Sequence, residues 1–191
     1  GGSGPIAVAQ SNITINFGTL NGFTMTMWIK PSSTLLTGGF PRFFSLGPNG
    51  TTDRGNLGSL QLLSNGNLQS GTSVQGFVNA AQTATSGFGA FNMPTNQWRF
   101  LALTYDGATL NFYSGSETNA VALLSAVSFA AGTLPLGPNW TLVVGNRIAR
   151  DRAFRGWLDD VRFYDNAAPL PMLETTRREA LAEPAISTEV S

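Results

Sequence analysis

The chain has 191 residues, of which 12% are charged, and its 11 basic residues balance its 11 acidic residues. This balance argues against nucleic acid or an anionic membrane as the main partner, and the lack of a long apolar run argues against membrane insertion. Nucleic acid and anionic membranes attract a basic excess, and no apolar run approaches the ~20 residues of a membrane span. Cysteine and histidine are absent, which excludes disulfides, thiolate metal sites and a histidine general base.

Short stretches of alternating apolar and polar residues follow one another along most of the chain, and they predict β-strands. Residues 23–30 show the pattern most plainly, with apolar side chains at every second position and Pro31 directly after them. Proline cannot donate to a strand ladder, so we expect the strand to end there. In chain order, strands are predicted at residues 6–9, 13–17, 23–30, 42–46, 58–64, 74–79, 97–105, 109–114, 121–127, 141–145 and 155–164.

Residues 96–115 predict a β-hairpin. Two apolar runs flank Asp106 and Gly107, and both of these positions tolerate the positive φ of a tight turn. Residues two apart in a strand share a face, and here both faces carry apolar side chains. We therefore expect both faces of the hairpin to be covered, which indicates a β-sandwich.

The end of the chain is the only part with a helical pattern. Leu170, Leu173, Arg177 and Leu181 recur at near-helical spacing within residues 169–183, and prolines frame this segment. The predicted organisation is an N-terminal extension at 1–11, one β domain at 12–168, a short helix at 169–183 and a β-prone tail at 184–191.

Three blocks of the chain carry a family resemblance when they are taken together and in order. They are residues 23–31 (FTMTMWIKP), the hairpin with Trp98 and the TYDG turn that contains Tyr105, and residues 142–164, which end in FRGWLDDVRFY. These blocks resemble the laminin G-like, concanavalin A-like jelly-roll superfamily, especially its bacterial branch. The resemblance implies an all-β fold of two antiparallel sheets packed face to face as a jelly-roll sandwich, with a short C-terminal helix.

The same resemblance leaves the function open, because this fold includes lectins, adhesion modules, glycosidases and spacers. Trp98, Tyr105, Trp157 and Asp159 are expected to serve the fold. Asp159 and Asp160 are neighbours on one predicted strand and point to opposite faces, so they cannot cooperate across a scissile bond. We expect Asp159 to be buried against backbone amides and Asp160 to contact Arg162. The chain is therefore predicted not to be an enzyme.

Calcium is a possible cofactor, because many laminin G-like domains carry it and the chain offers carboxylates in predicted loops. Calcium prefers six to eight oxygen ligands. The available residues are Asp53, Asp106 and Asp151. The alternative for each is a turn residue that caps its own backbone.

A second candidate site lies around the loop at residues 146–155. Trp140, Arg147, Asp151 and Arg152 combine an aromatic ring with planar charged groups. Sugar-binding and carboxylate-binding sites use these residue types, because rings stack and guanidinium groups bind in a bidentate manner. The alternative is a solvated polar loop between two strands.

The two tails suggest self-association. Residues 6–9 and 186–190 are β-competent, and Ile6, Val8, Ile186 and Val190 could add strands to the sheet edge of a neighbouring copy. The chain begins with Gly1 and not with methionine, so either a signal peptide has been removed or the first residues are a cloning scar; we expect a secreted protein.

The predicted function is an extracellular or cell-surface structural module that forms a homopolymer, such as a filament, tube or layer. The alternative is a carbohydrate-binding or adhesion module, with glycans or other surface proteins as partners.

Overall fold

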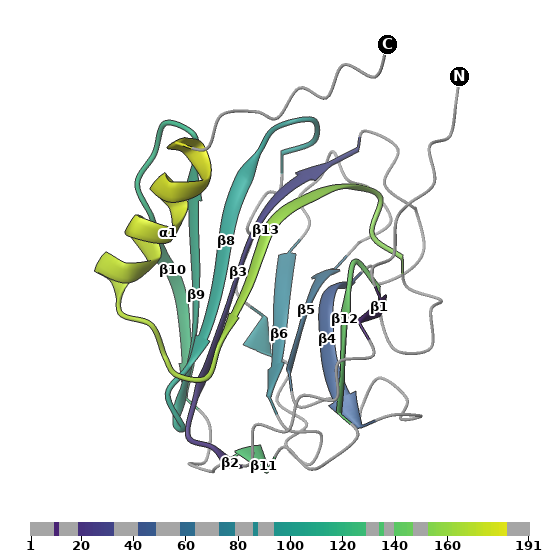
Figure 1. The fold of residues 1–191 in the computed structure, drawn as a ribbon, viewed down its shortest axis with the longest axis vertical. Helices are drawn as coiled ribbons and strands as arrows, with labels where there is room; N and C mark the ends of the chain where they lie inside the picture. The colour runs from purple at the N-terminus through teal and green to yellow at the C-terminus, as the bar shows by residue number, and fades with distance from the viewer. Residues whose placement is uncertain are drawn as a thin grey trace.

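The fold is a sandwich of two antiparallel sheets with one helix on its outside (Figure 1). The computed structural model describes residues 10–11, 19–32, 42–48, 58–63, 73–78, 86–87, 94–128, 134–135, 140–146 and 153–182. The six-stranded sheet has the order β1 (Gln10–Ser11), β12 (Trp140–Val144), β4 (Arg42–Pro48), β5 (Gly58–Leu63), β6 (Ser73–Val78) and β7 (Ser86–Gly87). The five-stranded sheet has the order β10 (Ala122–Ser128), β9 (Thr109–Ser116), β8 (Arg99–Tyr105), β3 (Phe23–Pro31) and β13 (Gly156–Tyr164).

The expected antiparallel sandwich with a C-terminal helix is confirmed. Two short strands, β2 (Thr19–Leu20) and β11 (Leu134–Pro135), form a separate pair, and the helix α1 spans Leu170–Ala182. The sequence pattern did not predict the two-residue strands β1, β2, β7 and β11, which are too short to show any alternation. The strands predicted at 6–9 and 13–17 lie outside the described residues. Among the residues described, no helix has the length and apolar character that crossing a membrane requires.

The inner face of the five-stranded sheet is apolar because alternate residues of neighbouring strands meet there. Met25 of β3 lies opposite Leu103 of β8, and Met27 lies opposite Leu101. All four side chains are fully buried. Phe43 of β4 and Phe154 are also buried, and their rings make an edge-to-face contact with centroids 5.1 Å apart.

The predicted hairpin is confirmed. β8 and β9 pair from Arg99 with Ser116 to Tyr105 with Leu110. At the turn, Asp106 Oδ1 accepts hydrogen bonds from the backbone amides of Ala108, at 2.9 Å, and Thr109, at 2.6 Å. Gly107 has a φ of 94°, which glycine adopts without strain. Asp106 therefore caps its own turn.

Helix α1 covers the outer face of this sheet, so the second face of the hairpin packs against a helix and not against another sheet (Figure 1). Leu173 of α1 is buried in a cluster with Trp28, Phe100 and Ala102. The Thr24 hydroxyl connects the segment before α1 to β3. It donates to the Asn166 carbonyl and accepts from the Ala168 amide, both at 2.7 Å.

Strand β13 is irregular at Asp159 and Asp160, and this corrects one expectation. The register against β3 shifts between Asp159 and Arg162, and Asp160 has a φ of 44°. The strand alternation is broken there, and Asp159 is exposed instead of buried, with its Oδ1 accepting one bond from the Asp160 amide. The expected contact of Asp160 with Arg162 is present at 2.7 Å.

Candidate functional site

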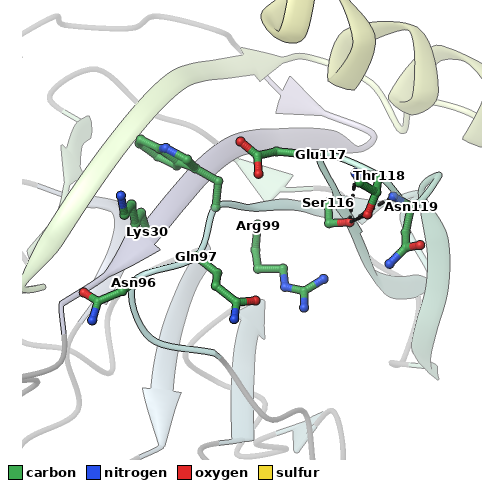
Figure 2. Close-up of a pocket in the computed structure, with 9 residues that line it drawn as sticks. Lys30, Asn96, Gln97, Arg99, Ser116, Glu117, Thr118 and Asn119 are labelled. Atoms are coloured by element: carbon green, nitrogen blue, oxygen red, sulfur yellow. Dashed lines mark hydrogen bonds between the residues drawn. The ribbon is translucent and has the colours of Figure 1, made fainter.

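A pocket of about 390 Å³ lies at one end of the five-stranded sheet, where β3 ends, β8 begins and β9 ends (Figure 2). This is the open end of the hairpin, at the other end of the strands from the Asp106 turn. Polar side chains dominate its lining. The lining residues are Lys30, Asn96, Gln97, Trp98, Arg99, Ser116, Glu117, Thr118 and Asn119.

The segment before β8 forms one wall of the pocket. The Asn96 amide donates to the Pro31 carbonyl at 2.7 Å, which ties this segment to the end of β3. Asn96 has a φ of 58°, a left-handed conformation that asparagine tolerates better than most residues. This turn places Gln97 and Trp98 beside Lys30 along the pocket.

The turn at residues 116–119 forms the other wall, and it is held by its own hydrogen bonds. Ser116 Oγ accepts from the amides of Thr118, at 3.3 Å, and Asn119, at 2.9 Å. The Ser116 amide donates to the Asn119 carbonyl at 3.0 Å. A serine that bonds to amides two and three residues further on is typical of a tight turn. The wall is therefore well ordered by local bonds.

Helix α1 holds this turn from the outer face of the sheet. Arg177 Nη1 donates to the Ser116 carbonyl at 2.6 Å, and only 6% of Arg177 is exposed. The Nε and Nη2 atoms of Arg177 donate to the two carboxylate oxygens of Glu174 at 2.9 and 2.7 Å. Glu174 also accepts from the Val121 amide at 2.9 Å. A β-carbon on Gly115 would lie 2.9 Å from Arg177 Cδ, so the arginine needs glycine at that position.

These contacts set the charge states of Glu174 and Arg177. The hydrogen bond from Arg177 is the largest influence on Glu174, and it lowers the pKa of the carboxyl to about 2 from an ordinary 4.5. Partial burial acts in the opposite direction but is the weaker effect. The bond to Glu174 in turn raises the pKa of Arg177. Both groups are therefore ionised at neutral pH, as a bidentate pair requires.

Arg99 differs from Arg177 because the described residues give its guanidinium no carboxylate partner. Its Nε atom is buried and has no hydrogen-bond partner in the described part of the chain. The ion pairs found among the described residues do not involve Arg99 or Lys30. Figure 2 shows Gln97, Arg99 and Asn119 pointing to one side of the strands, with Glu117 on the opposite side.

Aromatic side chains lie beside the same end of the sheet. Trp98 lines the pocket and packs partly against the cluster under α1. Trp157 of β13 lies opposite Lys30 of β3 and is 53% exposed. The Lys30 ammonium lies 5.3 Å from the centre of the Trp157 ring, within range of a cation–π contact.

The structure does not test the sugar site predicted near residues 146–155. Trp140 begins β12, but its side chain is outside what the structure describes. Arg147, Asp151 and Arg152 lie outside the described residues, so that site stays a prediction.

The same holds for two of the predicted calcium ligands, because Asp53 and Asp151 lie outside the described residues. Asp106 fits a calcium ion poorly, because the two turn amides occupy its Oδ1. Within the ranges that the structure describes, no group of three or more acidic residues could hold a metal ion. The described residues therefore give calcium no support.

The self-association hypothesis rests on Ile6, Val8, Ile186 and Val190, and all four lie outside the described residues. It also stays a prediction. Two of the four residues assigned to the fold, Trp98 and Tyr105, belong to the β8 hairpin. Tyr105 is 2% exposed, and its hydroxyl donates to the Gly107 carbonyl at 2.9 Å.

Sequence reasoning missed most of the pocket, although the chain carries a signal for it. Polar residues stand at both open ends of the predicted hairpin, as TNQWR before β8 and SETN from the end of β9. The open ends of a hairpin lie side by side, so these two groups had to meet. The inclusion of Lys30 could not be foreseen, because it depends on the pairing of β3 with β8.

Comparison with known proteins agrees with this architecture. Among solved structures, domain 4 of the extracellular arabinanase AbnA from Geobacillus stearothermophilus, in complex with arabinotriose, has a TM-score of 0.59 at 18% identity; the match covers 92% of this chain and 82% of that one. A putative carbohydrate binding protein from Bacteroides ovatus has a TM-score of 0.56 at 16% identity, over 87% of this chain and 43% of that one.

A third similar structure is the IT-sialidase CBM40 of Ruminococcus gnavus bound to alpha2,3 sialyllactose. Its TM-score is 0.55 at 14% identity, over 88% of this chain and 91% of that one. At these identities the likeness shows the fold alone. A comparison with curated protein sequences finds no significant match. The family model described as the concanavalin A-like lectin/glucanases superfamily matches residues 1–169, and the chain therefore belongs to that superfamily.

Proposed function

We propose that this chain is a non-catalytic carbohydrate-binding module that binds a saccharide in the pocket at the end of the five-stranded sheet. The observation that carries the proposal is the set of side chains that lines this pocket. The indole of Trp98 stands there with the amides of Asn96, Gln97 and Asn119. This replaces self-association as the favoured function, because the pocket lies within the described residues and the tails do not.

The chemistry of the lining suits a sugar. A pyranose or furanose ring has an apolar face that stacks on an aromatic side chain. Its hydroxyl groups both donate and accept hydrogen bonds, and an amide side chain offers both functions at once. Ligand sites commonly combine an aromatic surface with a few placed polar groups. The similar structures include an arabinanase domain with arabinotriose and a sialidase module with sialyllactose, which supports this assignment and an extracellular location.

The lining also favours binding over hydrolysis. Most glycosidases need two carboxyl groups that flank the scissile bond. Glu117 is the one carboxylate among the described residues of the lining. Outside the pocket, Asp160 is engaged by Arg162 at 2.7 Å. We therefore expect the chain to bind its saccharide without cleaving it.

The test is isothermal titration calorimetry of the purified chain against a panel of neutral and acidic oligosaccharides. For the saccharide that binds, Trp98→Ala removes the stacking surface, so we expect the affinity to fall at least about tenfold. Gln97→Ala removes one amide from an exposed position, and we expect a loss of roughly five- to tenfold.

The matched control is Trp157→Phe, which keeps a ring for Lys30 and lies outside the pocket lining. Its affinity should equal that of the unmodified chain. Circular dichroism spectra should show that all three variants are folded. If no saccharide of the panel binds, or if Trp98→Ala and Gln97→Ala both bind as tightly as Trp157→Phe, the proposal is wrong.

A further inference from the structure

We infer that the saccharide bound in this pocket carries a carboxylate and that Arg99 is the residue that binds it. This inference rests on the proposed function and deepens it by naming the class of ligand. It follows from the unsatisfied hydrogen-bonding capacity of Arg99, the charges around the pocket, and the side chains that share its side of the strands.

Arg99 has a donor that nothing in the described part of the protein satisfies. Its Nε atom is buried and unpartnered, whereas buried polar groups of proteins nearly always have a hydrogen-bond partner. The Nε–H and one terminal N–H of a guanidinium are parallel donors that match the two oxygens of a carboxylate. Arg99 stands at the first position of β8 and lines the pocket, so a carboxylate in the pocket can supply the missing acceptor once the side chain turns its buried Nε toward the ligand.

The charges around the pocket favour an anion. Lys30 and Arg99 both line it, and neither takes part in the ion pairs among the described residues. Glu117 is exposed, and its side chain points to the opposite side of the strands from Arg99 (Figure 2). The neighbouring Arg177 is neutralised by Glu174. The formal net charge of the chain is zero, so this positive site is a local feature.

The surroundings of Arg99 indicate a sugar acid and not a simple anion or an acidic peptide. Gln97 and Asn119 point to the same side as Arg99 (Figure 2). Each amide can donate to one hydroxyl group and accept from another. A uronic or sialic acid has a carboxylate and several hydroxyl groups on one ring, which matches this combination of one guanidinium and two amides.

The experiment compares acids with neutral partners of the same skeleton. The probes are trigalacturonate and sialyllactose, each compared with its own methyl ester and titrated by calorimetry into the intact chain. We expect at least one acid to bind roughly 10- to 100-fold more tightly than its neutral partner, the range that a charge-assisted hydrogen bond contributes. We also expect this preference to shrink between 50 and 500 mM NaCl, since salt screens charges near the surface.

Variants at Arg99 locate the preference. Arg99→Gln should abolish the difference between acid and neutral partner, and Arg99→Lys should keep only part of it, because lysine retains the charge and loses the parallel donors. Lys30→Gln should reduce the preference by a smaller factor and serves as the second test if the Arg99 variants fail to fold. The matched control is Arg178→Gln, an arginine 71% exposed on α1 and outside the pocket lining, which should leave the preference unchanged.

The outcomes separate the two proposals. Binding of neutral sugars with no preference for their acids overturns this inference and leaves the proposed function intact. Binding of no saccharide overturns both. An acid preference that survives in Arg99→Gln, or equally tight binding of a sulfated sugar or of polyglutamate, overturns the assignment of a sugar carboxylate to Arg99.

Discussion

Two arginines approach Ser116 from the two faces of the five-stranded sheet, and they serve different purposes. Arg177 lies on the outer face and is bonded to the Ser116 carbonyl and to both oxygens of Glu174. Arg99 lies opposite Ser116 in the strand register, and within the described part of the chain its buried Nε has no hydrogen-bond partner. Arg177 holds one wall of the pocket through Ser116, whereas Arg99 lines the pocket itself. Pairing, and not burial alone, therefore distinguishes Arg177 from Arg99.

The largest loss of stability is expected from breaking the ion pair between Arg177 and Glu174. Arg177→Ala leaves the partly buried Glu174 carboxylate and the Ser116 carbonyl without their main donor. Removing one partner of a buried ion pair costs about 3–5 kcal/mol. Urea denaturation followed by circular dichroism measures this loss.

The neighbouring residue provides the control for that substitution. Arg178 bonds to the same carboxylate at 2.7 Å, but its side chain is 71% exposed. Arg178→Ala should therefore cost only about 0.2–1 kcal/mol, as exposed ion pairs do. Equal losses in the two variants would show that the buried clamp has no special role.

A second substitution, at Gly115, disturbs Arg177 by crowding its side chain. Gly115→Ala places a methyl group 2.9 Å from Arg177 Cδ and 3.3 Å from the Asn119 carbonyl. Crowding of this kind costs about 1–3 kcal/mol. Because the clash is mainly with Arg177, the double variant with Arg177→Ala should be less destabilised than the sum of the single variants. Additive losses in urea denaturation would contradict this reading.

A further loss of stability is expected in acid. The pKa of Glu174 is about 2 in the folded chain and 4.5 as its ordinary value, so the unfolded chain takes up the proton first as the pH falls. The stabilisation from this carboxylate is complete above about pH 4.5 and is lost progressively as the pH falls toward 2.

Glu174→Gln should remove this part of the pH dependence of the free energy of unfolding. Arg99→Gln should retain it, since Arg99 does not pair with Glu174. Denaturation series between pH 6 and pH 2.5 make the comparison. A Glu174→Gln profile as steep as that of the unmodified chain would assign the acid sensitivity to other carboxyl groups.

The strand pattern was largely predictable, because alternation over seven to nine residues is a local property. The strands at residues 23–30 and 97–105 were expected within two residues of β3 and β8. The error at Asp159 has a physical cause. The prediction assumed that side chains alternate between the two faces of a regular strand. The irregularity at Asp160, with its φ of 44°, interrupts this alternation. A backbone irregularity of this kind has no pattern in the surrounding sequence.

The pocket was only partly predictable. Trp98 was recognised as a residue that serves the fold, and the structure places it in the pocket lining as well. The helical spacing included Arg177 but did not show that this arginine would be buried against a turn 61 residues earlier in the chain. The sugar site predicted around Arg147 and Asp151 drew on residue types within one loop, whereas the pocket combines segments from three strands.

The fold class of this protein follows from its sequence. Alternation, the turn at Asp106 and Gly107 and the three blocks of the superfamily are local features, and they were enough to predict the antiparallel sandwich and its terminal helix. Which polar residues meet, and which arginine has an unpartnered Nε among the described residues, depends on the packing of segments that are distant in the sequence. The two arginines share one side-chain chemistry, and only the pairing of β8 with β9 and the packing of α1 brought Glu174 to Arg177 and left the Arg99 Nε without a hydrogen-bond partner among the described residues.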